Sequence, residues 1–253
     1  MYQQEVVQDN KSALIKQAIK QRRRNKIYEA LLWLQYKFTI LHAPKRSGKT
    51  TTLAALMWWF KKMLNKEIFT IESPMGLTKY FGKCNELSLA EFFEQMQLID
   101  SIARDKRIAQ TYAGIEDEML QKAFMKEFML GRGVIIYDAV LIMDEMEKLI
   151  GKRRTMSKSS QTLTEIFMQM AHYYITFIGT LPNWTWMNKY GIRQLDWKGE
   201  VSRNEFTHRI HIDMSGAWPW ELNLDGRKYY KLFSTRNILP MSTNAFNIKG
   251  LDI

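Results

Sequence analysis

Short apolar runs alternate with amphipathic segments along the first part of the chain. Residues 37–42 form a β-prone run, and residues 49–64 have the spacing of an amphipathic helix. A second strand is predicted over residues 67–73, where Pro74 and Gly76 end the run. The order of strand, loop, helix and strand is typical of α/β proteins with a parallel sheet.

Two more helices are predicted downstream. Ser88 and Glu91 have the spacing of a capping box, and an apolar stripe with helical period runs from Phe92 to Ala103. The second helix covers residues 116–130. We interpret both stripes as packing surfaces and assign no cofactor to their Met and Phe side chains.

Two longer apolar runs follow these helices. Residues 134–143 are almost continuously apolar, as in a central parallel strand that is covered on both faces, and the run ends at Asp144 and Glu145. A helix over residues 159–173 and another buried strand over residues 174–181 come next. Together these elements predict an α/β fold with a mostly parallel central sheet.

The pattern changes beyond Pro182, where Trp-rich loops replace the strand and helix alternation. Residues 208–214 and 228–233 form two β-prone runs, and Asp225 and Gly226 mark a turn between them. We expect both runs to extend the same sheet as edge strands, which gives the fold a β-rich C-terminal edge.

The chain shows no internal repeat or linker, so we expect residues 1–253 to form a single domain. Residues 11–35 are predicted as helix, although the polar and basic run 21–26 interrupts the apolar spacing. Residues 1–36 hold seven basic and three acidic side chains, a net charge of +4. Two interpretations of this basic helical N-terminal arm stay open: a DNA-facing arm, or a helix on the domain edge with a solvated basic side.

The composition favours an intracellular protein with a polyanionic partner. The net charge is +11, which suits nucleic acid or a membrane surface, although a solvated surface would carry the same charge. The lone Cys84 excludes an internal disulfide, and no apolar stretch approaches the roughly 18 residues of a membrane span. We therefore expect a cytoplasmic protein.

The strongest motif lies between the first strand and the first helix. Residues 43–50 read Ala-Pro-Lys-Arg-Ser-Gly-Lys-Thr, which matches the Walker A pattern except that Ala43 replaces its first Gly. Gly48 permits close approach of the backbone to a polyphosphate, and the helix that begins there directs its positive end at the anion. This motif requires a strand before it and a helix after it, and both are predicted here.

Each side chain of the loop has a predicted task. Lys49 neutralises charge on the β- and γ-phosphates, Thr50 places its hydroxyl on Mg²⁺, and Thr51 and Thr52 donate near the α-phosphate. The predicted nucleotide-binding set is Pro44, Lys45, Arg46, Ser47, Gly48, Lys49, Thr50 and Thr51.

The acidic pair at the end of the apolar run 134–143 forms a Walker B pattern. Asp144 would hold Mg²⁺ together with Thr50, and Glu145 would orient or deprotonate the water that attacks the γ-phosphate. Two carboxylates can also cap a following helix, but their pairing with a phosphate loop disfavours that alternative. Thr180, with Asn183 nearby, is a candidate γ-phosphate sensor or an ordinary strand threonine.

With these motifs in this order, the chain resembles the additional-strand, catalytic-glutamate branch of P-loop ATPases. Within that branch it is similar to the FtsK/HerA superfamily and its viral genome-packaging members, and Zot-like proteins of viruses and plasmids are also similar. The residues that carry the resemblance are Gly48-Lys49-Thr50, Asp144-Glu145, Arg153-Arg154-Thr155-Met156-Ser157 and the strand that ends at Thr180. The chain departs from the family at Ala43 and at Thr180, where the family often has Gln.

The resemblance implies a RecA-like three-layer α/β/α P-loop core that uses ATP and Mg²⁺. It implies an ATPase that moves double-stranded DNA as a hexameric or pentameric ring, plausibly one that packages a viral genome into a capsid, with a capsid or membrane-vertex protein as docking partner. An arginine from one subunit would complete the ATP site of its neighbour. Arg154, beside Arg153, is our candidate for this arginine finger, and Arg193 and Arg203 are rivals.

Two alternative functions stay open. One is an AAA+ or DnaA-like replication or loader ATPase, which usually adds a helical lid where this chain has β-prone runs. The other is a Zot-like assembly or secretion ATPase, in which ATP binding organises a complex at a membrane and DNA is never pumped.

Overall fold

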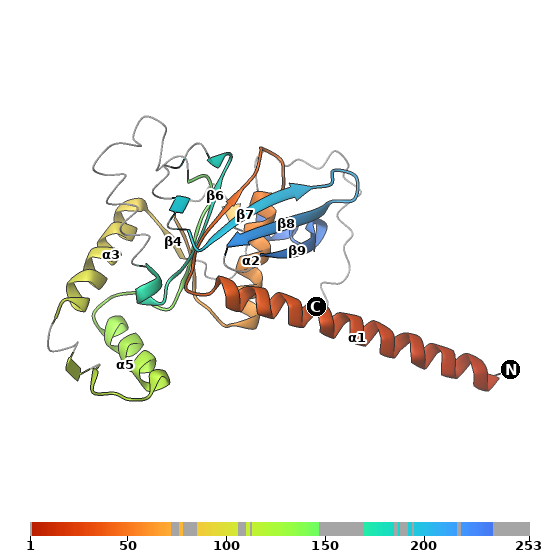
Figure 1. Cartoon of the computed structure of the whole chain (residues 1–253), viewed down its shortest axis with the longest axis horizontal. Helices are drawn as coiled ribbons and strands as arrows, with labels where there is room; N and C mark the ends of the chain where they lie inside the picture. Colours follow the sequence, from red (N-terminus) through yellow and green to blue (C-terminus); the bar gives the residue numbers. More distant parts are fainter. Residues whose placement is uncertain are drawn as a thin grey trace.

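An eight-stranded sheet forms the centre of the fold (Figure 1). The computed structural model describes residues 2–71, 76–77, 85–105, 110–111, 113–146, 170–184, 187, 192–193, 195–216 and 219–234. The strands of the sheet are β1 (Phe38–His42), β2 (Ile68–Ile71), β4 (Asn85–Leu87), β5 (Val140–Met143), β6 (Thr176–Leu181), β7 (Trp197–Arg203), β8 (Arg209–Gly216) and β9 (Trp220–Asp225). A separate antiparallel pair joins β3 (Gly76–Leu77) to β10 (Phe233–Ser234).

The strand order is β4-β2-β5-β6-β1-β7-β8-β9. Neighbours from β4 to β7 pair parallel, whereas β8 and β9 add an antiparallel extension at one edge. Strand β6 lies between β1 and β5, so the strand before the phosphate loop is not adjacent to the strand that ends at Asp144. This order confirms the predicted α/β fold with its mostly parallel sheet and β-rich C-terminal edge.

Helices cover both faces of the sheet, because its central strands are apolar on both faces. The helices are α1 (Tyr2–Leu34), α2 (Lys49–Met63), α3 (Leu89–Ala103) and α5 (Glu118–Gly131), with short 3-10 helices η2 (Met170–Tyr173), η4 (Gly226–Lys228) and η5 (Tyr230–Leu232). In β5, Val140 and Ile142 pack with α2 and the end of α1, whereas Leu141 and Met143 pack with α3 and α5. The alternation produces three layers, α/β/α.

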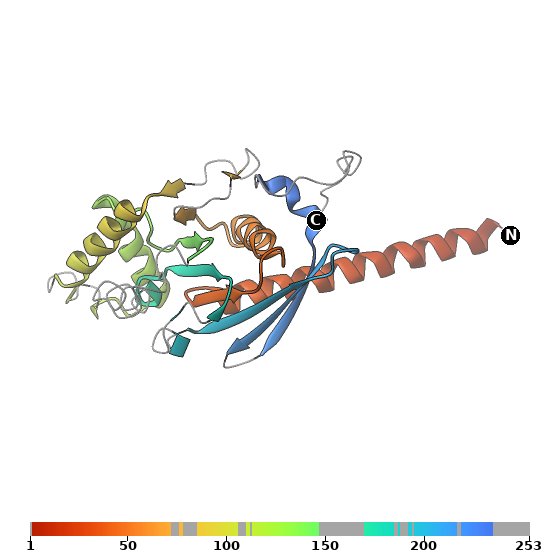
Figure 2. The same cartoon turned by 90° about the horizontal axis from the view of Figure 1, so that it is seen from above.

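Helix α1 is much longer than the sheet requires. It has 33 residues and therefore spans about 50 Å at 1.5 Å per residue. Ala30, Leu31 and Leu34 are buried near its C-terminus, and the N-terminal part extends far beyond the sheet in both views (Figures 1 and 2). The basic run 21–26 does not interrupt the helix, which also begins earlier than the predicted residue 11.

The start of α3 was predictable from its local sequence. The Ser88 hydroxyl accepts a hydrogen bond from the Glu91 amide, and the Glu91 carboxylate accepts one from the Ser88 amide. This capping box satisfies two amides that a helix start leaves without partners.

In the described part of the chain, no helix combines the length and apolarity that a membrane span needs.

The predicted strand over residues 134–143 is too long. Strand β5 begins only at Val140. Residues 134–139 form a largely buried loop in which Ile135 is exposed and Asp138 has a left-handed φ of 58°. Val134 and Ile136 are fully buried in the core on the α3 and α5 face. Burial, not strand pairing, therefore explains the apolar run.

The C-terminal predictions are half right. Strand β8 confirms the run at residues 208–214, but residues 228–233 form mainly 3-10 turns, and the strand next to β8 is β9 instead. Of the predicted helix over residues 159–173, the structure describes only the segment of η2, and residues 147–169 lie outside the described part.

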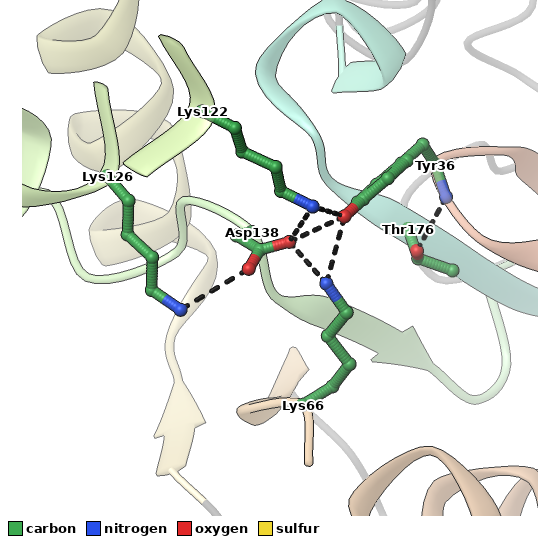
Figure 3. A network of polar contacts seen from close by, with 6 residues as sticks. All are labelled: Tyr36, Lys66, Lys122, Lys126, Asp138 and Thr176. Atoms are coloured by element: carbon green, nitrogen blue, oxygen red, sulfur yellow. Dashed lines mark hydrogen bonds and ion pairs between the residues drawn. The ribbon is translucent and has the colours of Figure 1, made fainter. Parts of the chain in front are cut away.

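A polar cluster ties α5 to the amino-terminal edge of the sheet (Figure 3). It consists of Tyr36, Lys66, Lys122, Lys126 and Asp138, and we call it the Asp138 cluster. The Asp138 carboxylate accepts a hydrogen bond from the Tyr36 hydroxyl at 2.8 Å and forms ion pairs with all three lysines. Because Lys122 and Lys126 lie on α5 and the other three residues precede β1, β2 and β5, the cluster joins four elements.

Burial and charge shift the pKa values within the Asp138 cluster. Burial raises the pKa of the Tyr36 phenol, and the Asp138 carboxylate raises it further, so the phenol stays protonated. Burial alone would raise the pKa of Asp138, but hydrogen bonds from Lys66 and Tyr36 and the charge of Lys66 hold it below its usual range. The pKa of Lys66 is lowered, mainly by burial. Asp138 is therefore ionised at pH 7 among the lysines of the cluster.

Candidate functional site

The phosphate loop connects β1 to α2 at the carboxyl-terminal edge of the sheet. Gly48, immediately before α2, has a φ of 95°, and a Cβ at this position would lie 2.9 Å from Cδ1 of Ile210. Only glycine meets both conditions without strain. Ala43 is fully buried, is not among the residues with positive φ, and donates its amide to the Leu181 carbonyl at 3.2 Å. Alanine therefore fits the first position of this loop.

The Lys49 ammonium folds back over the loop. It donates to the carbonyl of Ala43 and, at 2.8 Å, to the carbonyl of Pro44. The Ser47 hydroxyl donates to the same Pro44 carbonyl at 2.7 Å. Lys49 is thus held at the mouth of the loop, where a bound phosphate would compete with two carbonyl oxygens for its ammonium.

A chain of hydrogen bonds links the helix after the loop to the acidic strand. The Thr50 hydroxyl donates to one Asp144 carboxylate oxygen at 2.9 Å, and the Thr180 hydroxyl donates to the other at 2.5 Å. The Thr180 hydroxyl also accepts from the Glu145 amide at 3.0 Å. We call these four residues the Asp144 chain.

Two packing details hold the acidic pair in place. The Met146 amide donates to the Thr180 carbonyl at 3.0 Å, and the Met146 side chain lies over Gly179, where a Cβ would come within 2.1 Å of its sulfur. Gly179 therefore lets the segment after β5 pack directly on β6. Glu145 is exposed and has a left-handed φ of 59°, a backbone conformation that is uncommon for residues other than glycine.

The oxygen donors of the Asp144 chain suit Mg²⁺. This ion prefers oxygen ligands and is usually held by one or two carboxylates together with substrate phosphates. Asp144 is 4% exposed and Thr50 is half-buried beside it, so both would face a cation that enters next to the phosphate loop. Among the described residues, no group of three or more His, Cys, Asp or Glu side chains is arranged to hold a metal.

The remaining predicted phosphate-binding residues lie on the same loop or in the first turn of α2. Pro44, Lys45 and Arg46 are exposed, and Arg46 has a left-handed φ of 66°. Thr51 and Thr52 are buried, and the Thr52 hydroxyl donates to the Gly48 carbonyl at 3.0 Å within the helix. The Thr52 donor is therefore already engaged, while the α-phosphate role of Thr51 stays a prediction.

The candidate arginines have different positions. Arg153 and Arg154, with the rest of residues 153–157, lie outside the described residues. Arg193 is exposed. Arg203 is half-buried at the end of β7, with its Cβ 3.7 Å from the place where a Cβ on Gly48 would lie. Arg203 thus lies beside the phosphate loop of its own chain.

Sequence reasoning missed His42 and Trp184, which stack at the end of β1. Their ring centroids are 5.0 Å apart at an interplanar angle of 27°. Burial lowers the pKa of His42, and the nearby Lys49 charge lowers it further, while Glu200 acts in the opposite direction. A lone histidine between a strand and a loop offers no sequence signal for this stacking.

Two solved structures are similar over most of the chain. The N-terminal domain of zonular occludens toxin from Neisseria meningitidis has 17% identity and a TM-score of 0.43, over 78% of this chain and 99% of that one. A KaiC-like protein from the hyperthermophilic archaeon Pyrococcus horikoshii has 9% identity and a TM-score of 0.41, over 74% of this chain and 82% of that one. No family model and no curated protein matches the chain. The fold assignment therefore rests on the strand order and the phosphate loop.

Proposed function

We propose that this chain is an ATP-hydrolysing motor that moves double-stranded DNA and packages a viral genome into a capsid. The observation that carries the ATPase proposal is the Asp144 chain. It brings Thr50, Asp144, Thr180 and the Glu145 backbone, which are up to 130 positions apart, into one hydrogen-bonded centre beside the phosphate loop.

The phosphate loop supplies the binding groups. The helix that starts after Gly48 would attract a polyphosphate through the positive end of its dipole. The Lys49 ammonium exchanges its carbonyl partners for phosphate oxygens, which are better acceptors because they are charged.

The Asp144 chain supplies the hydrolytic groups. A Mg²⁺ ion held at this chain would supply positive charge against the charge that develops on the phosphates. Thr50 and Asp144 would hold the ion, and Thr180 keeps the Asp144 carboxylate oriented. Glu145 would take a proton from the attacking water, because it is the adjacent carboxylate and is exposed to solvent.

Helix α1 supports the DNA part of the proposal. All residues from 17 to 26 are exposed, and this segment has five basic and no acidic side chains. The basic residues are Lys20, Arg22, Arg23, Arg24 and Lys26, and they are distributed around the helix rather than on one face. Such a rod binds phosphate backbones without reading their sequence.

The last part of the proposal is that several copies of this chain assemble into a ring. In a ring, Arg154 of one subunit would act as the finger that stabilises charge on the γ-phosphoryl group bound by its neighbour. A capsid or membrane-vertex protein would dock the ring, and the host cytoplasm would be its place of action. The resemblance to packaging ATPases supports these elements.

The test compares ATP hydrolysis by the wild type and Glu145→Gln, with and without double-stranded DNA, while the oligomeric state is recorded. We expect DNA to stimulate wild-type turnover and Glu145→Gln to lower it by roughly 10²- to 10⁴-fold, the usual contribution of a general base. ATP binding should persist, since the carboxylate is not a predicted phosphate ligand.

Glu94→Gln is the matched control, because Glu94 is an exposed glutamate on α3. It should leave turnover unchanged. Turnover that is indifferent to DNA in an assembled preparation would contradict the motor and favour an assembly or secretion ATPase. Full activity of Glu145→Gln would remove Glu145 from the mechanism.

A further inference from the structure

The hairpin of β7 and β8 lies beside the phosphate loop and extends past the end of β1. His42, the last residue of β1, pairs with Glu200 of β7, and β7 continues for three more residues to Arg203. At about 3.3 Å per residue, the hairpin therefore rises roughly 10 Å beyond the end of β1. Ile210, opposite Arg203 in β8, contacts the position of Gly48 on this side.

Arg203 and His208 of the hairpin form a cluster of three planar side chains with Tyr230 of η5, which we call the hairpin cluster. An Arg203 terminal nitrogen is 2.9 Å from Nδ1 of His208, and the Tyr230 hydroxyl is 3.0 Å from the same atom. The Arg203 guanidinium lies 5.7 Å from the Tyr230 ring centroid. Since arginine can only donate, Nδ1 of His208 must accept.

Hydrogen bonds to the backbone fix the position of the hairpin cluster. The Asn204 carboxamide accepts from the amides of Phe206 and Thr207 at 3.1 and 2.9 Å, which fixes the turn. The Gly226 amide donates to the His208 carbonyl at 3.0 Å and joins η4 to the hairpin. These bonds hold the three planar groups in one place.

One donor in the hairpin cluster lacks an acceptor. The Nε of Arg203 is buried and has no hydrogen-bond partner among the described residues. A buried donor without a partner costs about 1–3 kcal/mol, and such groups commonly indicate a ligand or water. A ligand oxygen or nitrogen would satisfy it after a local shift of the side chain, because the atom is closed to solvent in this conformation.

The direction of the bound nucleotide follows from the two sides of the phosphate loop. Thr50 meets Asp144 on the side of β5 and β6, so the metal-bearing phosphates belong there. Gly48 meets Arg203 and Ile210 on the opposite side, at β7 and β8. A nucleoside triphosphate carries its metal-binding phosphates at one end and its base at the other, so the base end extends toward the hairpin.

We propose that the hairpin cluster binds the nucleoside part of the nucleotide, with the base against the planar faces of Arg203 and Tyr230. Guanidinium and aromatic groups both stack on bases, and the free Nε of Arg203 would donate to the ribose or base. This inference rests on the proposed nucleotide site and extends it from the phosphates to the nucleoside.

The test measures binding of Mg-ATP and of Mg-tripolyphosphate, which has the phosphates without the nucleoside. We expect Arg203→Ala to weaken ATP binding about tenfold, a typical loss for one base-stacking group, and to change tripolyphosphate binding less than twofold. Retained tripolyphosphate binding also shows that the variant is folded. Arg209→Ala, which removes the same charge from an exposed position on β8, should change neither affinity.

Equal weakening of both ligands by Arg203→Ala would overturn the proposal, because Arg203 would then contact phosphate. Unchanged ATP binding would also overturn it. If the wild type binds neither ligand, the phosphate site itself fails and the proposed function fails with it. Photolabelling of the unmodified chain with 8-azido-ATP gives an independent answer: label within residues 203–230 supports the proposal, and label elsewhere refutes it.

Discussion

Each edge of the sheet holds a largely buried aspartate, and the two aspartates have opposite partners. At the amino-terminal edge, Asp138 pairs with Lys66, Lys122 and Lys126. At the carboxyl-terminal edge, Asp144 accepts hydrogen bonds from the hydroxyls of Thr50 and Thr180, and in the described part of the chain it forms no ion pair. Lysine side chains neutralise the charge of Asp138, whereas Asp144 keeps its charge because its partners are neutral hydroxyls.

The difference separates a structural carboxylate from one prepared for a ligand. A buried carboxylate is unfavourable unless it is paired, so the lysines around Asp138 stabilise the fold. Two hydroxyls satisfy the oxygens of Asp144 without cancelling its charge, which leaves it able to attract a divalent cation. The two edges should therefore respond oppositely to removal of their charges.

The largest expected effect is the loss of activity in Asp144→Asn. We expect hydrolysis to fall about a thousandfold, since metal positioning contributes several kcal/mol to catalysis. The free energy of unfolding without ligand should be unchanged or about 1 kcal/mol higher, because a buried charge without a cationic partner is removed. Turnover assays and urea titrations of one preparation measure both. A large loss of stability would mean that Asp144 is structural after all.

Asp138→Asn should show the reverse pattern. At pH 7 it leaves Lys66 buried without its carboxylate, and we expect the free energy of unfolding to fall by about 3 kcal/mol. Turnover per folded molecule should change little, because the Asp138 cluster lies at the edge opposite the phosphate loop. A loss of turnover in fully folded protein would show that the two edges are coupled.

The Asp138 cluster also predicts the acid response. Because the folded pKa of Asp138 is depressed, its stabilising contribution is present above its unfolded pKa of about 3.9 and is lost as pH falls through the folded pKa. The wild type should therefore lose stability below about pH 4, and the Asp138→Asn curve should be flatter there. Parallel curves would mean that other carboxylates dominate acid unfolding.

The two edges also differ in how far the sequence predicts them. The phosphate loop is contiguous, and the acidic pair directly follows an apolar strand, so local patterns predict these residues. Their hydrogen bonds required the strand order, which brings Thr180 beside Asp144 only because β6 lies next to β5. The Asp138 cluster has no local pattern, since Tyr36 is 102 positions from Asp138.

The strands show the same limit. Apolar content predicted the central strands well, but it failed at residues 134–139, where a buried loop is as apolar as a strand. Strand β9 alternates exposed and buried positions, with Leu222 and Leu224 directed inward, and this weaker period-2 signal was overlooked. The contact of Arg203 with the phosphate loop depends on how far β7 extends past β1, which no local pattern encodes.

The smallest expected effect comes from Thr180→Val, which preserves shape and removes the hydroxyl shared by Asp144 and Glu145. The Glu145 amide and one Asp144 oxygen would lose their partner, so we expect stability to fall by about 1–2 kcal/mol. Turnover should fall about tenfold, because Asp144 and Glu145 lose their common support, whereas ATP affinity should hold. Thr176→Val, at the other end of β6, is the matched control: its hydroxyl accepts from the Tyr36 amide, so it should lower stability without lowering turnover. If both variants lower turnover alike, Thr180 acts through the packing of β6 and not through the acidic pair.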